Sequence, residues 1–357
     1  MYKNILPGIG RLGTMFAFGL ALWAGTVTGQ TPCQTTCGSD DPAPSIFWGG
    51  VEPAPRDSWY ASTDALALQR IFSGLGPAAT LGMGSTGSVA LSQKSLDDPY
   101  QAGIQMLVGH TFSDSPYQAE VSYFWIDPLA ESAQTASPTF NLFSPFTNFG
   151  QPLDTRVDEN SLTQIHLVSR LEGGEANLKY KLCLPAGDPT IALLFGVRHV
   201  GLREEFDYSS TPLLNVNPVS VHAHTNNDLW GPQIGGSVDY GHQDIWIHAE
   251  GKAAICNNGY DRELQANIGG AQSTQPKASE SCTAYAADIS LSIFWRPTSA
   301  LTARVGYQAL WIDQVALAAR NFAPSVEMLT DAMADPPINQ RGTLIYQGPF
   351  AGLQLSW

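Results

Sequence analysis

The chain contains 357 residues, of which 43% are hydrophobic and 14% are charged. This composition excludes a disordered chain, because disordered proteins are poorer in hydrophobic residues and richer in charge. The 32 acidic residues outnumber the 18 lysines and arginines and give a net charge of −14, so we expect no nucleic-acid partner. Beyond the N-terminus, no uninterrupted apolar run reaches the roughly 18 residues of a membrane-spanning helix, which excludes a bundle of such helices.

The first residues have the organisation of a secretory signal peptide. Lys3 and Arg11 precede an apolar run at 12–27, and small residues lie at its end. This three-part pattern directs export, so we expect residues 1–29 to be removed. A single membrane anchor is the alternative, but the apolar run is short and no positive cluster follows it. Residues 30–57 are rich in proline, glycine, threonine and aspartate and are predicted to form a flexible N-terminal segment.

From Ser58 onward, apolar and polar residues alternate with a period of two. Within 284–296, for example, Tyr285 and Trp295 fall on an apolar face and Asp288 falls on the opposite, polar face. Such alternation predicts β-strands with one apolar face. The predicted strands are about ten to fifteen residues long, which suits a tilted membrane-spanning strand better than an ordinary one. Ten strands are predicted, at 58–69, 101–112, 117–126, 162–183, 190–208, 223–240, 245–256, 283–296, 300–312 and 342–357.

Tyrosine and tryptophan begin and end many of the apolar faces. Aromatic girdles of this kind mark the two membrane–water boundaries of outer-membrane barrels. The predicted girdle residues are Tyr117, Trp125, Trp230, Tyr285, Trp295, Tyr307, Trp311 and Trp357.

Short and long connections alternate along the predicted strands. The short ones are 113–116, 184–189, 241–244 and 297–299, and the long ones are 70–100, 127–161, 209–222, 257–281 and 313–341. Outer-membrane barrels have short periplasmic turns and longer outer loops. We therefore predict an all-β fold, a single antiparallel transmembrane β-barrel of about ten strands over residues 58–357, located in the cell outer membrane. A twelve-stranded barrel is the alternative if 88–93 forms a strand that has a further partner strand.

One predicted strand, 162–183, changes its apolar parity part-way. Ile165 and Leu167 share one parity, whereas Leu178 and Tyr180 share the other. The change falls at Gly173-Gly174, where we predict a β-bulge, because one extra residue moves every later side chain to the other face. A tight hairpin there is the alternative.

Several segments resemble a family of planctomycete outer-membrane β-barrels that are related to the Legionella-type pore-forming outer-membrane proteins. The resemblance implies an outer-membrane barrel with a pore role and offers no catalytic residues. The segments that carry it are WYASTDALALQR (59–70), SRLEGGEANLKYKL (169–182), LLFGVRHVGLREEFDY (193–208), TNNDLWGPQIGG (225–236), GKAAICNN (251–258) and YQALWIDQVALA (307–318).

If the apolar faces contact lipid, the alternate residues face the lumen. Acids and bases are nearly balanced on these faces, so the lumen is expected either to be held together by salt bridges or to form a pore whose charges set a field. The predicted lumen-lining residues are Asp64, Glu120, Arg170, Glu175, Lys179, Arg198, His248, Glu250, Lys252, Asp288, Arg296 and Arg304.

Cysteines and histidines give few further signals. Cys256 and Cys282 bracket the predicted loop 257–281, and a disulfide between them would fix its base. His222 and His224 share one strand face, but a histidine pair at a barrel rim is more often polar surface than a metal site. We therefore predict no metal, no cofactor and no enzymatic activity, although a catalytic triad is defined by geometry rather than order.

The predicted function is a narrow, porin-like channel for passive passage of ions or small solutes, because ten strands give a backbone radius of only roughly 10 Å. The alternative is a closed structural or surface-interaction barrel that acts through the outer loops 127–161 and 313–341. The phenylalanine-rich stretch 140–149 would then bind a partner, or it would fold inward and plug the barrel. Expected partners are outer-membrane lipid, and the assembly machinery that reads a C-terminal signal such as Leu353, Leu355 and Trp357.

Overall fold

The structure is a computed structural model that describes residues 58–72, 76–96, 99–113, 115–182, 189–213, 218–242, 244–268, 270–322 and 337–357. The predicted signal peptide (1–29) and N-terminal segment (30–57) lie outside the described residues. In the described part of the chain, no helix has the length and apolar character needed to cross a membrane.

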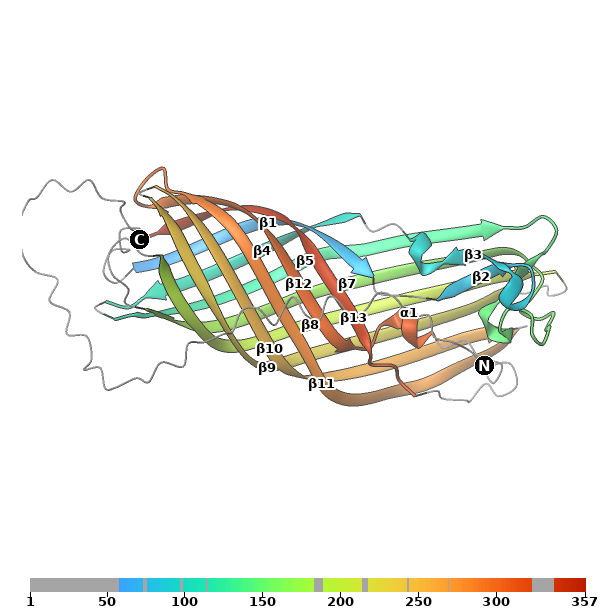
Figure 1. Cartoon of the computed structure of the whole chain (residues 1–357). Helices are drawn as coiled ribbons and strands as arrows, with labels where there is room; N and C mark the ends of the chain where they lie inside the picture. The colour runs from blue at the N-terminus through green and yellow to red at the C-terminus, as the bar shows by residue number, and fades with distance from the viewer. Residues whose placement is uncertain are drawn as a thin grey trace, which may run out of the picture. The chain divides into compact units, whose positions relative to one another are not determined.

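Ten antiparallel strands form a closed ring (Figure 1). Each strand pairs with its neighbours in the ring, and the last strand pairs with the first. The prediction of a ten-stranded barrel is therefore confirmed. In ring order the strands are β1 (Ser58–Phe72), β4 (Tyr100–Thr111), β5 (Tyr117–Ala136), β7 (Asn160–Lys181), β8 (Thr190–Pro212), β9 (Val219–His242), β10 (Ile245–Ile268), β11 (Ala271–Trp295), β12 (Leu301–Val315) and β13 (Gly342–Ser356).

In the described part of the chain, three short strands lie outside this ring. They are β2 (Pro77–Leu81), β3 (Ser88–Ser92) and β6 (Leu142–Phe143). β6 pairs with β7, β2 pairs with β6, and β3 pairs with β2. The segment predicted at 88–93 is thus a strand, but it extends an outer branch of the sheet and does not enlarge the barrel to twelve strands.

A collar of exposed apolar side chains surrounds the end of the barrel that carries the short turns. On β10, Ile245, Ile247 and Ile255 are 57%, 46% and 62% exposed, whereas the intervening Trp246 is buried. A water-soluble protein does not expose a continuous ring of this kind, but an outer-membrane barrel presents it to lipid. The span from Ile245 to Ile255 matches the nine to eleven residues of a tilted membrane strand.

The predicted girdle residues all lie on the outward face of the ring. Trp311 is partly buried, and the others are exposed: Tyr117, Trp125, Trp230, Tyr285, Trp295, Tyr307 and Trp357.

Beyond the collar, strands β7 to β11 continue and invert their polarity. They contain 22 to 25 residues each, whereas β1, β12 and β13 contain 15, and they extend past these shorter strands (Figure 1). On β10, the outward positions after Ile255 become polar, beginning with Asn257, while the inward Tyr260 and Leu264 are buried. The prediction of a long loop at 257–281 is therefore wrong, because β10 continues to Ile268 and β11 begins at Ala271.

The same inversion explains the parity change in β7. Gly173 and Gly174 pair with both neighbouring strands in an uninterrupted register, so the predicted β-bulge, like the alternative hairpin, is wrong. Ile165 and Leu167 point into the apolar interior beyond the collar, whereas Leu178 points outward into the collar. The side chains keep their faces along β7, but the environment of each face changes. A register shift does occur opposite β7, between Ile126 and Leu129 of β5.

An apolar layer crosses the middle of the barrel. Its buried side chains come from every ring strand except β4 and from the segment after β12. The layer comprises Leu66, Leu68, Ile126, Leu171, Val200, Leu202, Leu229, Ala254, Cys256, Ala284, Ala286, Leu310, Ile312, Val315, Leu317, Leu344, Tyr346 and Phe350. A second cluster beyond it includes Phe146, from the predicted loop 127–161, and Phe322.

Candidate functional site: a polar cavity below an apolar layer

A polar cavity of about 550 Å³ occupies the barrel interior below the apolar layer. Its lining begins near the short-turn end with Ser58, Ser299 and Ser356 and ends at Leu68 and Phe350 of the apolar layer. The strands that form the collar on their outward face therefore supply the polar lining on their inward face, as the alternation of side chains requires.

Most of the predicted lumen-lining residues meet in this cavity. Asp64 is buried on the inward face of β1 and pairs with Arg304, which lines the cavity. The cavity itself is lined by Glu120, Glu175, Lys179, Arg198, His248, Glu250, Lys252, Asp288, Arg296 and Arg304, together with other residues.

Arg170 does not face the lumen, and its prediction is wrong. It is exposed on the outer face of β7, beyond the collar. The predicted bulge at Gly173-Gly174 would have reversed the parity of the strand, but the register is continuous. Arg170 therefore lies on the face opposite to Glu175 and Lys179.

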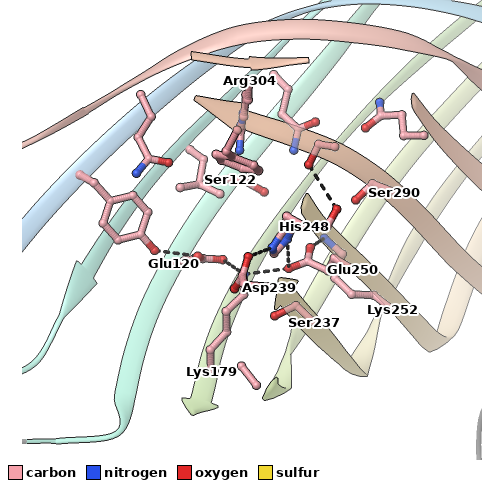
Figure 2. A pocket seen from close by; sticks show the side chains of 18 of the residues that line it. Glu120, Ser122, Lys179, Ser237, Asp239, His248, Glu250, Lys252, Ser290 and Arg304 are labelled. Atoms are coloured by element: carbon pink, nitrogen blue, oxygen red, sulfur yellow. Dashed lines mark hydrogen bonds and ion pairs between the residues drawn. The ribbon is translucent and has the colours of Figure 1, made fainter. Parts of the chain in front are cut away.

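The first part of the charge network is centred on Lys179. Its Nζ lies 2.9 Å from Glu120 Oε2 and 2.7 Å from Glu250 Oε2. The Tyr60 hydroxyl donates a hydrogen bond to Glu120 Oε1 at 2.6 Å. Figure 2 shows Glu120, Lys179 and Glu250 pointing toward one another from different strands. Each buried charge has an opposite partner, which offsets the cost of removing it from water.

Glu175 is the centre of the second part. Its carboxylate accepts from Lys252 Nζ at 2.5 Å, from Arg198 at 2.9 Å and from Gln233 Nε2 at 2.9 Å. Lys252 Nζ also lies 3.1 Å from Glu250 Oε1, which joins the two parts, and Arg198 also pairs with Asp288. The network therefore spans the lumen as alternating acids and bases. This arrangement stabilises one geometry and leaves few unpaired charges for a ligand.

Two further pairs complete the lining. His248 Nδ1 lies 2.7 Å from Asp239 Oδ1, and both residues are labelled in Figure 2. Arg304 binds Asp64 through Nε at 2.6 Å and donates to Ser62 Oγ at 2.9 Å. Within the described residues, no group of three or more histidine, cysteine, aspartate or glutamate side chains is arranged to hold a metal ion.

The segment after β12 contributes to the apolar layer that lies on the outer side of the cavity. We call residues 316–322 the plug; it includes the short helix α1 (Ala318–Asn321). The chain leads into it from Gln314, a non-glycine residue with a φ of 63°, which is a conformation that side chains disfavour. Val315 and Leu317 then pack into the apolar layer.

Buried polar side chains hold the plug in place. Asn227 accepts from the Ala316 amide at 2.7 Å and donates to the Ala316 carbonyl at 2.8 Å. The Ala318 amide donates to Glu204 Oε2 at 3.0 Å, and Glu204 also pairs with Arg70. Sequence reasoning missed these residues, because a lone polar residue among inward apolar positions carries no signal of what it will contact.

The predicted disulfide is not formed, since Cys256 and Cys282 are both free. The register places Cys282 opposite Asn258, two residues from Cys256. The thiol of Cys282 instead lies 3.5 Å from the Gln314 carbonyl oxygen. His222 and His224 lie on the outward face, and His222 pairs with Asp207 at 2.6 Å.

Comparisons with known proteins support the barrel fold. The chain matches no family model and no curated protein. Among solved structures it is similar to the outer-membrane protease OmpT from Escherichia coli, with a TM-score of 0.53, 9% identity, and coverage of 85% of this chain and 98% of that chain. It is also similar to the toluene transporter TodX from Pseudomonas putida, with a TM-score of 0.30, 11% identity, and coverage of 85% and 90%.

A third similar structure is Neisserial surface protein A, with a TM-score of 0.24, 10% identity, and coverage of 83% and 96%. At these identities the likeness shows the fold alone. OmpT, the neighbour with a TM-score above 0.5, supports the barrel fold, and the collar of exposed apolar side chains indicates that the barrel lies in the outer membrane. The resemblance to planctomycete and Legionella-type barrels stays a prediction.

Proposed function

We propose that the protein is a plugged outer-membrane channel, closed in the described conformation, that passes ions or small solutes when the plug moves. The observation that carries this proposal is a polar cavity that reaches mid-barrel and ends at an apolar layer to which a separate segment of chain contributes Leu317. Polar and charged groups line the cavity, and an ion entering from the short-turn end would keep polar partners as far as the apolar layer.

The apolar layer sets the barrier. An ion that crosses it would lose its water without gaining partners, which is costly. Leu317 comes from the plug and not from a barrel strand, so moving one segment removes part of the barrier without breaking the ring. Passage is therefore coupled to the contacts that Asn227 and Glu204 make with the plug.

The second candidate is a closed barrel that acts by surface interaction. The observation that favours it is the outer extension of β7 to β11, which continues well beyond the collar and is filled by apolar side chains such as Phe146 and Phe206. This candidate needs no movement of the plug, so conductance distinguishes it from the channel.

Planar-bilayer recording of purified protein tests the proposal. We expect rare openings for the wild type and a several-fold higher open probability for Asn227→Ala, which removes both hydrogen bonds to Ala316. Asn226→Ala is the matched control, because Asn226 lies on the outward face of the same strand. A second variant, Leu317→Asp, places a charge in the apolar layer and should open the channel further. If both plug variants fold, as judged by the shift in gel migration on heating, and neither conducts, the channel proposal is wrong and the closed barrel stands.

A further inference from the structure

A second pocket lies on the outward face of the barrel wall, beyond the collar. It has a volume of about 360 Å³ and crosses strands β7 to β11. We call it the outer-wall pocket; its lining residues are Val168, Arg170, Arg203, Glu205, His224, Asn226, Asp261 and Lys277. The proposed channel function does not involve this face.

Two arginines stand directly opposite each other in this pocket. Arg170 of β7 pairs in register with Arg203 of β8, and both side chains are exposed. Like charges directly opposite on one face of a sheet repel each other. Arg203 donates from Nε to Asn226 Oδ1 at 3.2 Å, but within the described residues neither arginine has an ion pair with a carboxylate. Inside the barrel, by contrast, Arg198 and Arg304 each bind a carboxylate.

The carboxylates of the pocket do not remove this excess of positive charge. Asp261 already pairs with Lys277, with 3.1 Å between Nζ and Oδ2. Glu205 lies opposite Val168 on one neighbouring strand and opposite His224 on the other. The pocket thus holds three permanent cations, Arg170, Arg203 and Lys277, against two carboxylates, Glu205 and Asp261. This local excess occurs in a chain whose net charge is −14, so an anion from outside the protein would relieve it.

The height of the pocket identifies the source of that anion. Gly174 and His199 lie in register with the exposed Trp230, which marks the outer edge of the collar. Arg170 and Arg203 lie four residues further along their strands. At about 3.3 Å per residue and a tilt of about 40°, they lie roughly 10 Å beyond the aromatic level. This level lies outside the hydrocarbon core, on the outer side where the headgroups of the outer leaflet are found.

We propose that the outer-wall pocket binds a phosphate group on the headgroup of an outer-leaflet glycolipid, with Arg170 and Arg203 as its direct ligands. A guanidinium presents two parallel N–H donors that match a phosphate, and two guanidiniums on adjacent strands can share one phosphate. The bound phosphate converts a repulsive arginine pair into an attractive bridge between β7 and β8.

Native mass spectrometry of the full barrel, released from nanodiscs, tests this proposal. The nanodiscs contain phosphatidylcholine with either phosphorylated lipid A or the same lipid stripped of its phosphates. We expect the wild type to retain phosphorylated lipid A, and Arg170→Gln and Arg203→Gln each to retain about tenfold less. Arg156→Gln is the matched control, because Arg156 is an exposed arginine that pairs with Asp154 away from the pocket.

A thermal measurement in detergent separates binding from a folding defect. Without lipid, Arg170→Gln should melt no lower than the wild type, because the substitution removes a like-charge contact. With phosphorylated lipid A, the melting temperature of the wild type should rise and that of Arg170→Gln should not. Three results would overturn the assignment to a lipid phosphate. They are equal retention of the stripped lipid by the wild type, unchanged retention of phosphorylated lipid A by Arg170→Gln, and an equal rise in melting temperature with inorganic phosphate alone.

Discussion

At the residue scale, the lumen charges act as a set rather than as separate groups. Glu175 contacts Lys252, Arg198 and Gln233, and Lys252 in turn contacts Glu250. Removing one member leaves its partners buried without an opposite charge, which costs more than the pair itself contributes. The cost of a substitution here is therefore set by the residues that remain.

Replacing Glu175 with glutamine tests this coupling. The Glu175→Gln variant should lose about 3–5 kcal/mol of unfolding free energy, because Arg198 and Lys252 lose a shared carboxylate. The measurement is equilibrium unfolding in denaturant from lipid vesicles. The control is Glu263→Gln, which lies on the outward face of β10 and accepts a hydrogen bond from Gln265 Nε2 at 2.8 Å. It should cost less than about 1 kcal/mol. Equal losses for both variants would show that the network is not coupled.

His222 at the outer end of β9 gives a pH-dependent contribution. The hydrogen bond to Asp207, 2.6 Å from Nδ1, raises the pKa of His222 above its ordinary value. A raised pKa in the folded state means that the stabilisation is present below the unfolded pKa and is lost as the pH rises through the folded pKa. Because both side chains are more than one-third exposed, the effect should be below about 1 kcal/mol.

A pH series of unfolding measurements checks the sign. His222→Gln should be less stable than the wild type at about pH 5.5 and as stable as the wild type at about pH 9, because these pH values lie on either side of the histidine titration range. A difference that grows with rising pH would contradict the assignment.

At the element scale, each long strand passes through two environments. Between Ile245 and Ile255, β10 is apolar outside and mostly polar inside. Beyond Asn257 it is polar outside, and its inward face buries Tyr260 and Leu264 together with Asn258 and Arg262. Alternation with a period of two was visible in the sequence, so the ten strands and their order were predictable. The strand ends were not, because the inverted pattern beyond the collar reads as a loop or, at Gly173, as a bulge when one fixed lipid-facing parity is assumed.

A charge placed on the lipid-facing side of β10 measures the depth of the collar. Ala249→Lys, near the middle of the collar, should cost about 2–4 kcal/mol of folding free energy in lipid vesicles, because the ammonium group loses its water. Gln265→Lys, on the same face but beyond the collar, should cost about 0–1 kcal/mol. A small cost at both positions would mean that this face does not contact lipid.

At the scale of the whole molecule, the fold combines a membrane barrel with an outer half that has the polarity of a soluble protein. The ring of ten strands and most of the lumen residues follow from local alternation, which is set by neighbours in sequence. The position of the plug does not follow from local alternation, because it depends on Asn227 and Glu204. These two residues are far in sequence from Ala316 and Ala318, and they meet them only in the closed ring. Arg170 was misassigned for a related reason, because its face depends on the register of three paired strands.

Spin-label accessibility along β10 tests the central feature of the molecule, its two-environment barrel, most directly. Single labels are placed at Ile247, Ala249, Ala253, Asn257 and Gln265, all on the outward face, in protein reconstituted into vesicles. We predict that the first three collide with lipid-soluble oxygen, and that the last two collide with a water-soluble nickel reagent, with the change falling between 253 and 257. Water accessibility at Ile247 and Ala249, or oxygen accessibility that continues unchanged to Gln265, would contradict the membrane-spanning barrel and its water-exposed outer half.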